Sequence, residues 1–144
     1  MATLSPRLQE IVDNLPLRPG LRVIEIGCGT GAAAREVARR VGPTGHVLAV
    51  DRSAKAIAAV RRSAAALIAA NRLTARELAA EELELGPGEA RYDIAFAVRV
   101  GAFDGRQPHA GAVALERLGH ALLPGGRLFI DGGDPLRELV VTTR

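Results

Sequence analysis

The stretch Glu25-Ile26-Gly27-Cys28-Gly29-Thr30-Gly31 decides the fold predicted for this chain. Its first two residues end the run 22–26, a short apolar run typical of a β-strand. Its last two residues begin the run 30–41, which is rich in alanine and has helical spacing. Glycine adopts positive φ and lets a ligand approach backbone amides that a Cβ would shield. The sequence therefore predicts a strand, a tight ligand-binding turn and a helix.

The same alternation of strand and helix continues on both sides of this turn. A short helix starts at Pro6 behind the N-cap Ser5, and Ser53 caps a second long helix. The further predicted strands are 46–50, 73–78, 92–98 and 127–130. The further predicted helices are 54–71 and 109–123, and the loop predicted over 101–111 overlaps the first turn of the second of these helices. Such alternation favours a parallel sheet covered by helices on both faces, with ligands at the carboxyl ends of its strands.

Composition is typical of one globular domain. The chain has 144 residues, of which 48% are hydrophobic and 24% charged. Cys28 is the single cysteine, no apolar run approaches the roughly 20 residues of a membrane span, and no secretory leader is visible, so we expect a cytoplasmic protein. Of 19 lysine and arginine residues only Lys55 is lysine, which indicates a GC-rich, bacterial genome.

Two acids flank the glycine turn, and they favour a nucleoside with a charged tail. Asp51 comes twenty residues after Gly31, at a strand end, where a carboxylate can accept ribose hydroxyls. Gly27, Gly29 and Ala32 also satisfy the dinucleotide fingerprint, so a nicotinamide-dinucleotide-binding protein is an alternative. Glu25, however, suits an ammonium group better than a pyrophosphate, and the chain is short for an added substrate domain.

Residues 23–31 resemble motif I of the class I S-adenosylmethionine-dependent methyltransferases. Asp51 resembles the acid after strand two of that family, Tyr92-Asp93-Ile94 the start of its strand four, and Leu123-Pro124-Gly125-Gly126-Arg127-Leu128 its approach to strand five. The resemblance spans about residues 20–131. It implies a Rossmann-like three-layer αβα sandwich with a mainly parallel sheet of order 3-2-1-4-5.

The same resemblance implies one domain over 1–144, with an N-terminal helix and turn over 1–19, a core over 20–131 and a tail over 132–144. The sheet is truncated after strand five, with room for one extra strand over 138–143. We expect a bare strand-five edge to pair with a second copy, which predicts a homodimer.

The resemblance also assigns roles to residues around S-adenosylmethionine. Glu25 would hold the methionine ammonium, Asp51 the ribose hydroxyls, and Arg52 would lie along the adenine. The family often has Gly-Asp-Ala after strand three, where this chain has Leu78-Ala79-Ala80, so the adenine contact is either lost or made by Glu81. The predicted cofactor-binding residues are Glu25, Gly27, Cys28, Gly29, Gly31, Asp51, Arg52, Ala79, Ala80 and Val98.

No catalytic triad is visible, and methyl transfer from a sulfonium needs none, because alignment of the nucleophile supplies most of the catalysis. Candidate substrate contacts or bases follow strand four: Arg99, Asp104, Arg106 and His109. Asp131 and Asp134 follow strand five and either line the same cleft or form an ordinary turn. Cys28 is expected to pack as a small residue, and no metal site is expected.

The preferred interpretation is a methyltransferase that uses S-adenosylmethionine and acts on a small molecule. A cofactor-binding module without catalysis of its own is the second reading. Nucleic acid is not expected as a partner, because the net charge is only +3, aromatic residues are 3% and no Pro-Pro-Tyr motif is present. A membrane partner is not expected either.

Overall fold

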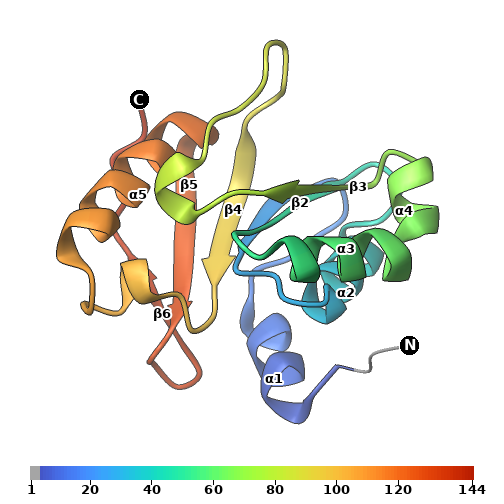
Figure 1. The fold of residues 1–144 in the computed structure, drawn as a ribbon, viewed down its shortest axis with the longest axis horizontal. Coiled ribbons are helices and arrows are strands. Elements are labelled where there is room, and N and C mark those ends of the chain that lie inside the picture. Colours follow the sequence, from blue (N-terminus) through green and yellow to red (C-terminus); the bar gives the residue numbers. More distant parts are fainter. Residues whose placement is uncertain (1–3) are drawn as a thin grey trace.

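A six-stranded sheet of order β3-β2-β1-β4-β5-β6 runs through residues 4–144, the part of the chain that the computed structural model describes (Figure 1). Strands β1 to β5 are parallel, and β6 pairs antiparallel with β5. The strands are Arg22–Ile26 (β1), His46–Asp51 (β2), Leu73–Glu77 (β3), Tyr92–Ala97 (β4), Leu122–Asp131 (β5) and Leu136–Leu139 (β6). The predicted strand order and the extra C-terminal strand are confirmed. Residues 1–3 of the predicted N-terminal segment lie outside the described residues.

Helices cover both faces of the sheet, which confirms the three-layer architecture (Figure 1). They are α1 (Pro6–Asn14), α2 (Ala32–Val41), α3 (Ala54–Ser63), α4 (Ala65–Ala69) and α5 (Pro108–Ala121), with 3-10 turns η1 (Ala80–Glu82) and η2 (Gly101–Phe103). Val23 packs into the core beneath α1, α2 and α3, and its neighbour Ile24 into the core beneath α5. Successive strand residues point to opposite faces, so a strand covered on both sides is apolar throughout.

Local chemistry sets the starts of two helices as predicted. The Ser5 hydroxyl accepts the Leu8 N–H at 3.2 Å ahead of α1, and the Ser53 hydroxyl accepts the Ala56 N–H at 3.1 Å ahead of α3. These side chains satisfy backbone donors that have no partner within the helix.

The single helix predicted over 54–71 is wrong, because the chain leaves helical geometry at Ala64 (φ −112°, ψ 20°) and divides into α3 and α4. The Ser63 hydroxyl donates to the carbonyl of Thr30 in the glycine turn at 3.1 Å. Such a side-chain bond competes with helix continuation, and its partner is remote in sequence. The alanine-rich sequence carries no glycine or proline to signal the break.

Strand β5 is longer than the predicted 127–130 and begins at Leu122. Its register with β4 shifts from Tyr92↔Leu122 to Ile94↔Arg127, so Pro124-Gly125-Gly126 forms an irregularity within the strand. The predicted helix over 109–123 correspondingly starts one residue earlier and ends two earlier. Strands β3 and β4 each end one residue before their predicted ends, and α2 starts at Ala32.

Strand β6 covers the edge of β5 that was expected to be bare. It begins at Leu136, two residues before the predicted start of the extra strand. The tail then crosses α5, where the Arg144 N–H donates to the Gly119 carbonyl at 2.8 Å. The homodimer stays a prediction, without the bare edge from which it was argued. In residues 4–144, no helix combines the length and apolar character needed to cross a membrane.

Candidate functional site

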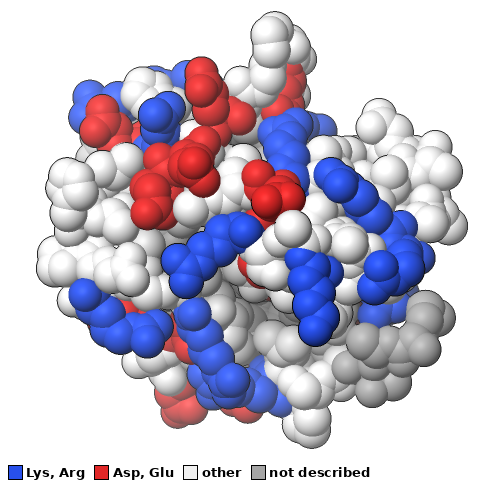
Figure 2. Space-filling model, viewed as in Figure 1, with Lys and Arg blue, Asp and Glu red and all other residues white. Residues whose placement is uncertain are grey.

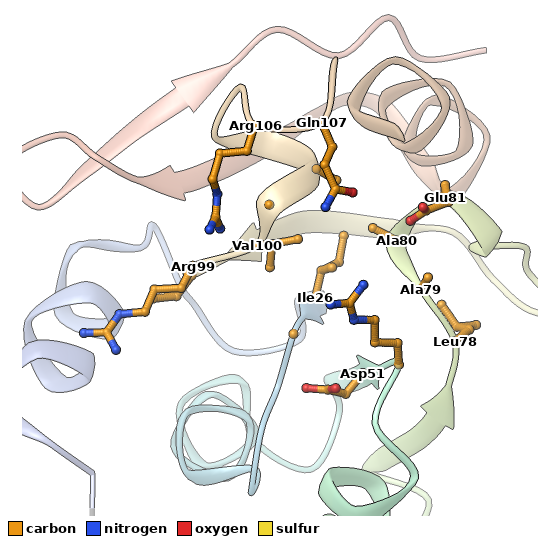
Figure 3. Close-up of a pocket in the computed structure, with 15 residues that line it drawn as sticks. Ile26, Asp51, Leu78, Ala79, Ala80, Glu81, Arg99, Val100, Arg106 and Gln107 are labelled. Atoms are coloured by element: carbon orange, nitrogen blue, oxygen red, sulfur yellow. The ribbon is translucent and has the colours of Figure 1, made fainter. Parts of the chain in front are cut away.

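Two adjoining cavities lie where the parallel strands end, as the topology predicts. The first, of about 390 Å³, is drawn in Figure 3 and is lined by Ile26, Gly27, Asp51, Arg52, Leu78, Ala79, Ala80, Glu81, Val98, Arg99, Val100, Gly101, Ala102, Arg106 and Gln107. The second, of about 660 Å³, is lined by Ser5, Pro6, Arg7, Leu8, Glu25, Gly27, Cys28, Gly29, Thr30, Ala32, Val98 and Arg99. Because Gly27, Val98 and Arg99 line both, the two cavities form one elongated cleft.

The glycine turn forms the floor between the two cavities. The N–H groups of Gly27 and Cys28 both donate to the Val50 carbonyl, at 2.8 and 3.0 Å, which ties the turn to the end of β2. Gly27 has φ +76°, and a Cβ there would lie 2.8 Å from Cγ2 of Val100, which also lines the first cavity. Glycine is required at this position by both backbone conformation and space.

Glu25 lies at the base of the second cavity with only 3% of its surface exposed. Its Oε1 is buried and has no hydrogen-bond partner among residues 4–144. Burial first, and then the charge of Asp51, raise the pKa of this carboxyl well above its ordinary value, against the opposing effect of a hydrogen bond from the Ala34 backbone. A buried, unsatisfied acid is costly, and an ammonium group placed against it would remove the cost.

Asp51 is held rigidly at the edge of the first cavity. Its Oδ2 accepts the Gly29 N–H at 3.0 Å and its Oδ1 accepts the Ser53 N–H at 2.9 Å. Each carboxylate oxygen has a further lone pair available. The carboxylate is therefore fixed by the backbone and still able to accept hydrogen bonds from two neighbouring hydroxyls.

Residues after β3 form the side of the first cavity opposite the glycine turn. Leu78, Ala79 and Ala80 line it, but the Ala79 N–H is already used by Oε1 of Glu82 at 2.8 Å. Glu81 also lines the cavity, so a carboxylate is present where the usual Gly-Asp-Ala is missing (Figure 3). Arg52 lines the same cavity beside Asp51.

Cys28 lies in the turn and lines the second cavity, and its buried Sγ lies 3.7 Å from the Gly29 carbonyl. Burial raises the pKa of its thiol far above the physiological range. The protonated thiol behaves as a small packing group.

The remaining wall, which we call the lip, is formed by the residues between β4 and α5. Of the predicted substrate-contact residues, the structure brings Arg99 and Arg106 into the cavity lining, and places Asp104 and His109 outside it. Asp104 instead binds Arg106, with 2.7 Å between its Oδ2 and the guanidinium, and His109 lies in the first turn of α5. Gln107, which sequence reasoning missed, lines the cavity; nothing in its local sequence distinguishes it.

Asp131 supports the lip from beneath rather than lining the cleft. Its Oδ1 accepts the backbone N–H of Arg99 at 3.0 Å, where Arg99 has φ +58°. Its Oδ2 lies 3.3 Å from the guanidinium of Arg7 on α1. One carboxylate thus links α1, β4 and β5, whereas Asp134 lines neither cavity.

Close packing of α5 against η2 holds the lip in place, and Gly111→Ala tests this. A Cβ at Gly111 would collide with the Ala102 carbonyl oxygen. Alanine normally stabilises a helix interior, yet here we expect the substitution to lower the free energy of unfolding by about 1–3 kcal/mol, because backbone must move. Urea unfolding measures the change, with the exposed neighbour Ala112→Ser as control. A variant as stable as the wild type would contradict the packing described.

Within residues 4–144, no three His, Cys, Asp or Glu side chains are grouped so that they could hold a metal ion. The residues instead fit the organic cofactor that the sequence resemblance implies. An unpaired buried carboxylate, a glycine floor without side chains and a second, backbone-held carboxylate follow one another along the cleft. This order matches the ammonium group, the sulfonium centre and the ribose of S-adenosylmethionine.

Comparisons with known proteins agree with this geometry. The family model described as a methyltransferase domain matches residues 23–126. A protein-L-isoaspartate O-methyltransferase of Methanothrix thermoacetophila is 33% identical over 133 residues, which are 92% of this chain and 57% of that protein. This chain therefore spans little more than half the length of that relative.

Solved structures show the same fold. An S-adenosylmethionine-dependent O-methyltransferase from Thermotoga maritima superimposes with a TM-score of 0.65 at 22% identity, over 90% of this chain and 45% of that one. A coclaurine N-methyltransferase bound to N-methylheliamine and S-adenosylhomocysteine superimposes with a TM-score of 0.67 at 18% identity, over 85% and 34%.

Proposed function

Because the chain belongs to the class I S-adenosylmethionine-dependent methyltransferase family, we propose that it transfers the methyl group of this cofactor to a small-molecule acceptor. The observation that carries the proposal is Glu25, whose buried Oε1 has no hydrogen-bond partner among residues 4–144 and which lines the same cleft as Asp51. Glu25 would hold the methionine ammonium, Asp51 the ribose hydroxyls, and Leu78 to Glu81 the adenine side.

S-Adenosylmethionine supplies a methyl group on a sulfonium, which an oxygen, nitrogen or carbon nucleophile can attack. The residues of this chain position the two partners and exclude water. Glu25 lines one cavity and Asp51 the other, and Gly27, Val98 and Arg99 line both. The acceptor would approach the cofactor past Val98 and Arg99, so the lip after β4 is the wall that it meets.

The distribution of aromatic and basic residues supports a small acceptor. All four aromatic side chains, Tyr92, Phe96, Phe103 and Phe129, are buried, so none is available on the surface for bases to stack on. Figure 2 shows basic side chains scattered over the face in view rather than aligned in one stripe. The second cavity is also closed on one side by α1, which narrows the approach.

Calorimetry with S-adenosylhomocysteine and with NAD tests the cofactor. We expect micromolar binding of S-adenosylhomocysteine, about −8 kcal/mol, and much weaker binding of NAD, because Glu25 would repel a pyrophosphate. Micromolar binding of NAD alone would identify the chain as a nicotinamide-binding protein and overturn the proposal.

Transfer of labelled methyl to a cell extract tests the acceptor. We expect label in the low-molecular-weight fraction. Label confined to protein or RNA would overturn the small-molecule acceptor, with an isoaspartyl peptide as the first peptide to try because of the 33% identical relative. Cofactor binding without any transfer would instead favour a binding module that lacks catalysis of its own.

A further inference from the structure

Two side-chain donors converge on the lip of the cleft. Arg106 and Gln107 extend from the segment between η2 and α5 into the first cavity (Figure 3). An ideal Cβ built at Gly101 would lie 3.5 Å from Nη2 of Arg106 and 3.6 Å from Nε2 of Gln107. Both nitrogens therefore lie above the same small residue, within reach of one ligand group.

Asp104 orients Arg106 and leaves part of its guanidinium free. Its Oδ2 accepts from Nε at 2.7 Å and lies 2.7 Å from Nη2, and its Oδ1 accepts the Arg106 backbone N–H at 3.1 Å. No bond to Nη1 is formed by the described residues. A guanidinium held along one edge presents its remaining donors in a fixed direction.

Arg99 adds a second positive charge, and its guanidinium has no ion-pair partner among residues 4–144. Its side chain extends away from Arg106 and Gln107, toward α1 on the side of the second cavity (Figure 3). The acids of the cleft lie elsewhere: Asp51 and Glu81 are on the nucleoside side and Glu25 is at the base of the second cavity.

The start of α5 also favours a negatively charged group at the lip. Gln107 is the N-cap of this 14-residue helix, and no side chain caps it. Uncapped amides at a helix N-terminus favour a negative charge, and here they adjoin the same cavity wall. The inner side of the lip therefore combines the Arg106 guanidinium, the Gln107 amide and a helix N-terminus, while Asp104 pairs with Arg106 and Asp131 bonds the Arg99 backbone.

We propose that the methyl acceptor carries a carboxylate or phosphate group, which Arg106 and Gln107 bind at the lip. This inference rests on the proposed methyl transfer and specifies its substrate class. The anionic group anchors the acceptor at the lip, and its nucleophile then points into the part of the cleft that Val98 and Arg99 line.

Calorimetry on the full chain saturated with S-adenosylhomocysteine, at fixed ionic strength, tests the anion site. The probes are benzoate and phenyl phosphate, with benzamide and phenol as uncharged counterparts. We expect at least one anion to bind tenfold or more tightly than its counterpart, and the tighter anion tells carboxylate from phosphate. Arg106→Gln should weaken binding of that anion at least tenfold, and Gln107→Ala should weaken it severalfold. Arg117→Gln, on the exposed face of α5 and away from both cavities, should leave it unchanged.

A second measurement uses the acceptor itself. The low-molecular-weight fraction of the extract is divided on an anion-exchange resin at pH 7. Each resulting fraction is then incubated with the protein and labelled S-adenosylmethionine. We expect the acceptor to be retained by the resin and released by salt.

These measurements separate failure of the inference from failure of the proposed function. Three outcomes would each overturn the anionic acceptor while cofactor binding stands. They are equal binding of charged and uncharged probes, anion binding that survives both cleft substitutions, and an acceptor in the unretained fraction. Absence of S-adenosylhomocysteine binding to the wild type would overturn the proposed function instead.

Discussion

Glu25→Gln is expected to weaken binding of S-adenosylhomocysteine about 100-fold, or about 2.8 kcal/mol. Glu25 is 3% exposed and its Oε1 lacks a partner among the described residues, so the ligand ammonium would form a buried, charge-assisted hydrogen bond there. Removing one member of such a pair costs several kcal/mol because the other charge is left desolvated. Calorimetry measures the change, and Glu116→Gln on the exposed face of α5 is the matched control.

The same substitution should make the unliganded protein more stable, by about 1 kcal/mol near pH 8. Burial, followed by the charge of Asp51, raises the pKa of Glu25 in the folded protein. When the pKa of a carboxyl is higher in the folded than in the unfolded protein, the contribution of that carboxyl to stability is fully present below its pKa in the unfolded protein. The contribution is lost as the pH rises through its pKa in the folded protein. The variant has no such loss, so its advantage over the wild type should be larger at pH 8 than at pH 5.

Urea unfolding of the two proteins at both pH values checks this sign. A gain in stability together with a loss of affinity is the pattern of a residue retained for binding. Equal stability differences at pH 5 and pH 8 would show that the pKa of Glu25 is not raised in the folded protein, and unchanged affinity for S-adenosylhomocysteine would show that Glu25 does not hold the ammonium.

Asp51→Ala should weaken S-adenosylhomocysteine at least tenfold, or about 1.4 kcal/mol. The carboxylate is placed at the end of β2 by hydrogen bonds from Gly29 and Ser53, so little freedom is lost when it accepts ribose hydroxyls. Because those bonds also order the turn, loss of affinity alone would not separate a ribose contact from support of the backbone.

A ligand that lacks the 2′- and 3′-hydroxyls resolves the two roles. If Asp51 binds the hydroxyls, removing them from the ligand should weaken the wild type but have little further effect on Asp51→Ala, since coupled losses are not additive. Ser53→Ala, which keeps the backbone N–H that Asp51 accepts, is the control. Fully additive losses would show that the ribose lies elsewhere.

Several residues that the sequence analysis singled out do line the cleft, because the signals for them are local. The glycine turn and Glu25 lie within one strand-to-helix connection, and Asp51 ends the next strand, which pairs with the first at Ile26↔Val50. Element boundaries were less accurate where no glycine or proline marks them. The break at Ala64 depends on a hydrogen bond between Ser63 and Thr30, which helical periodicity cannot reveal.

The lip after β4 shows why candidate residues cannot be assigned from chain position alone. Arg99, Asp104, Arg106 and His109 all follow the same strand, yet only two of them line the cleft. The chain turns through η2 and starts α5 at Pro108, so residues a few positions apart face different directions. The direction in which each side chain of such a segment points is set by packing, as where Gly111 packs against Ala102.

The class of cofactor was thus encoded in short stretches of sequence, because a parallel sheet brings strand ends together by topology and needs only the right residue at each end. The arrangement of the lip after β4 and the buried state of Glu25 were decided by tertiary structure. Arg7, Arg99 and Asp131 meet only because β4 pairs with β5 and α1 packs beside them. No local periodicity records contacts between segments so far apart, and the geometry of the lip depends on those contacts.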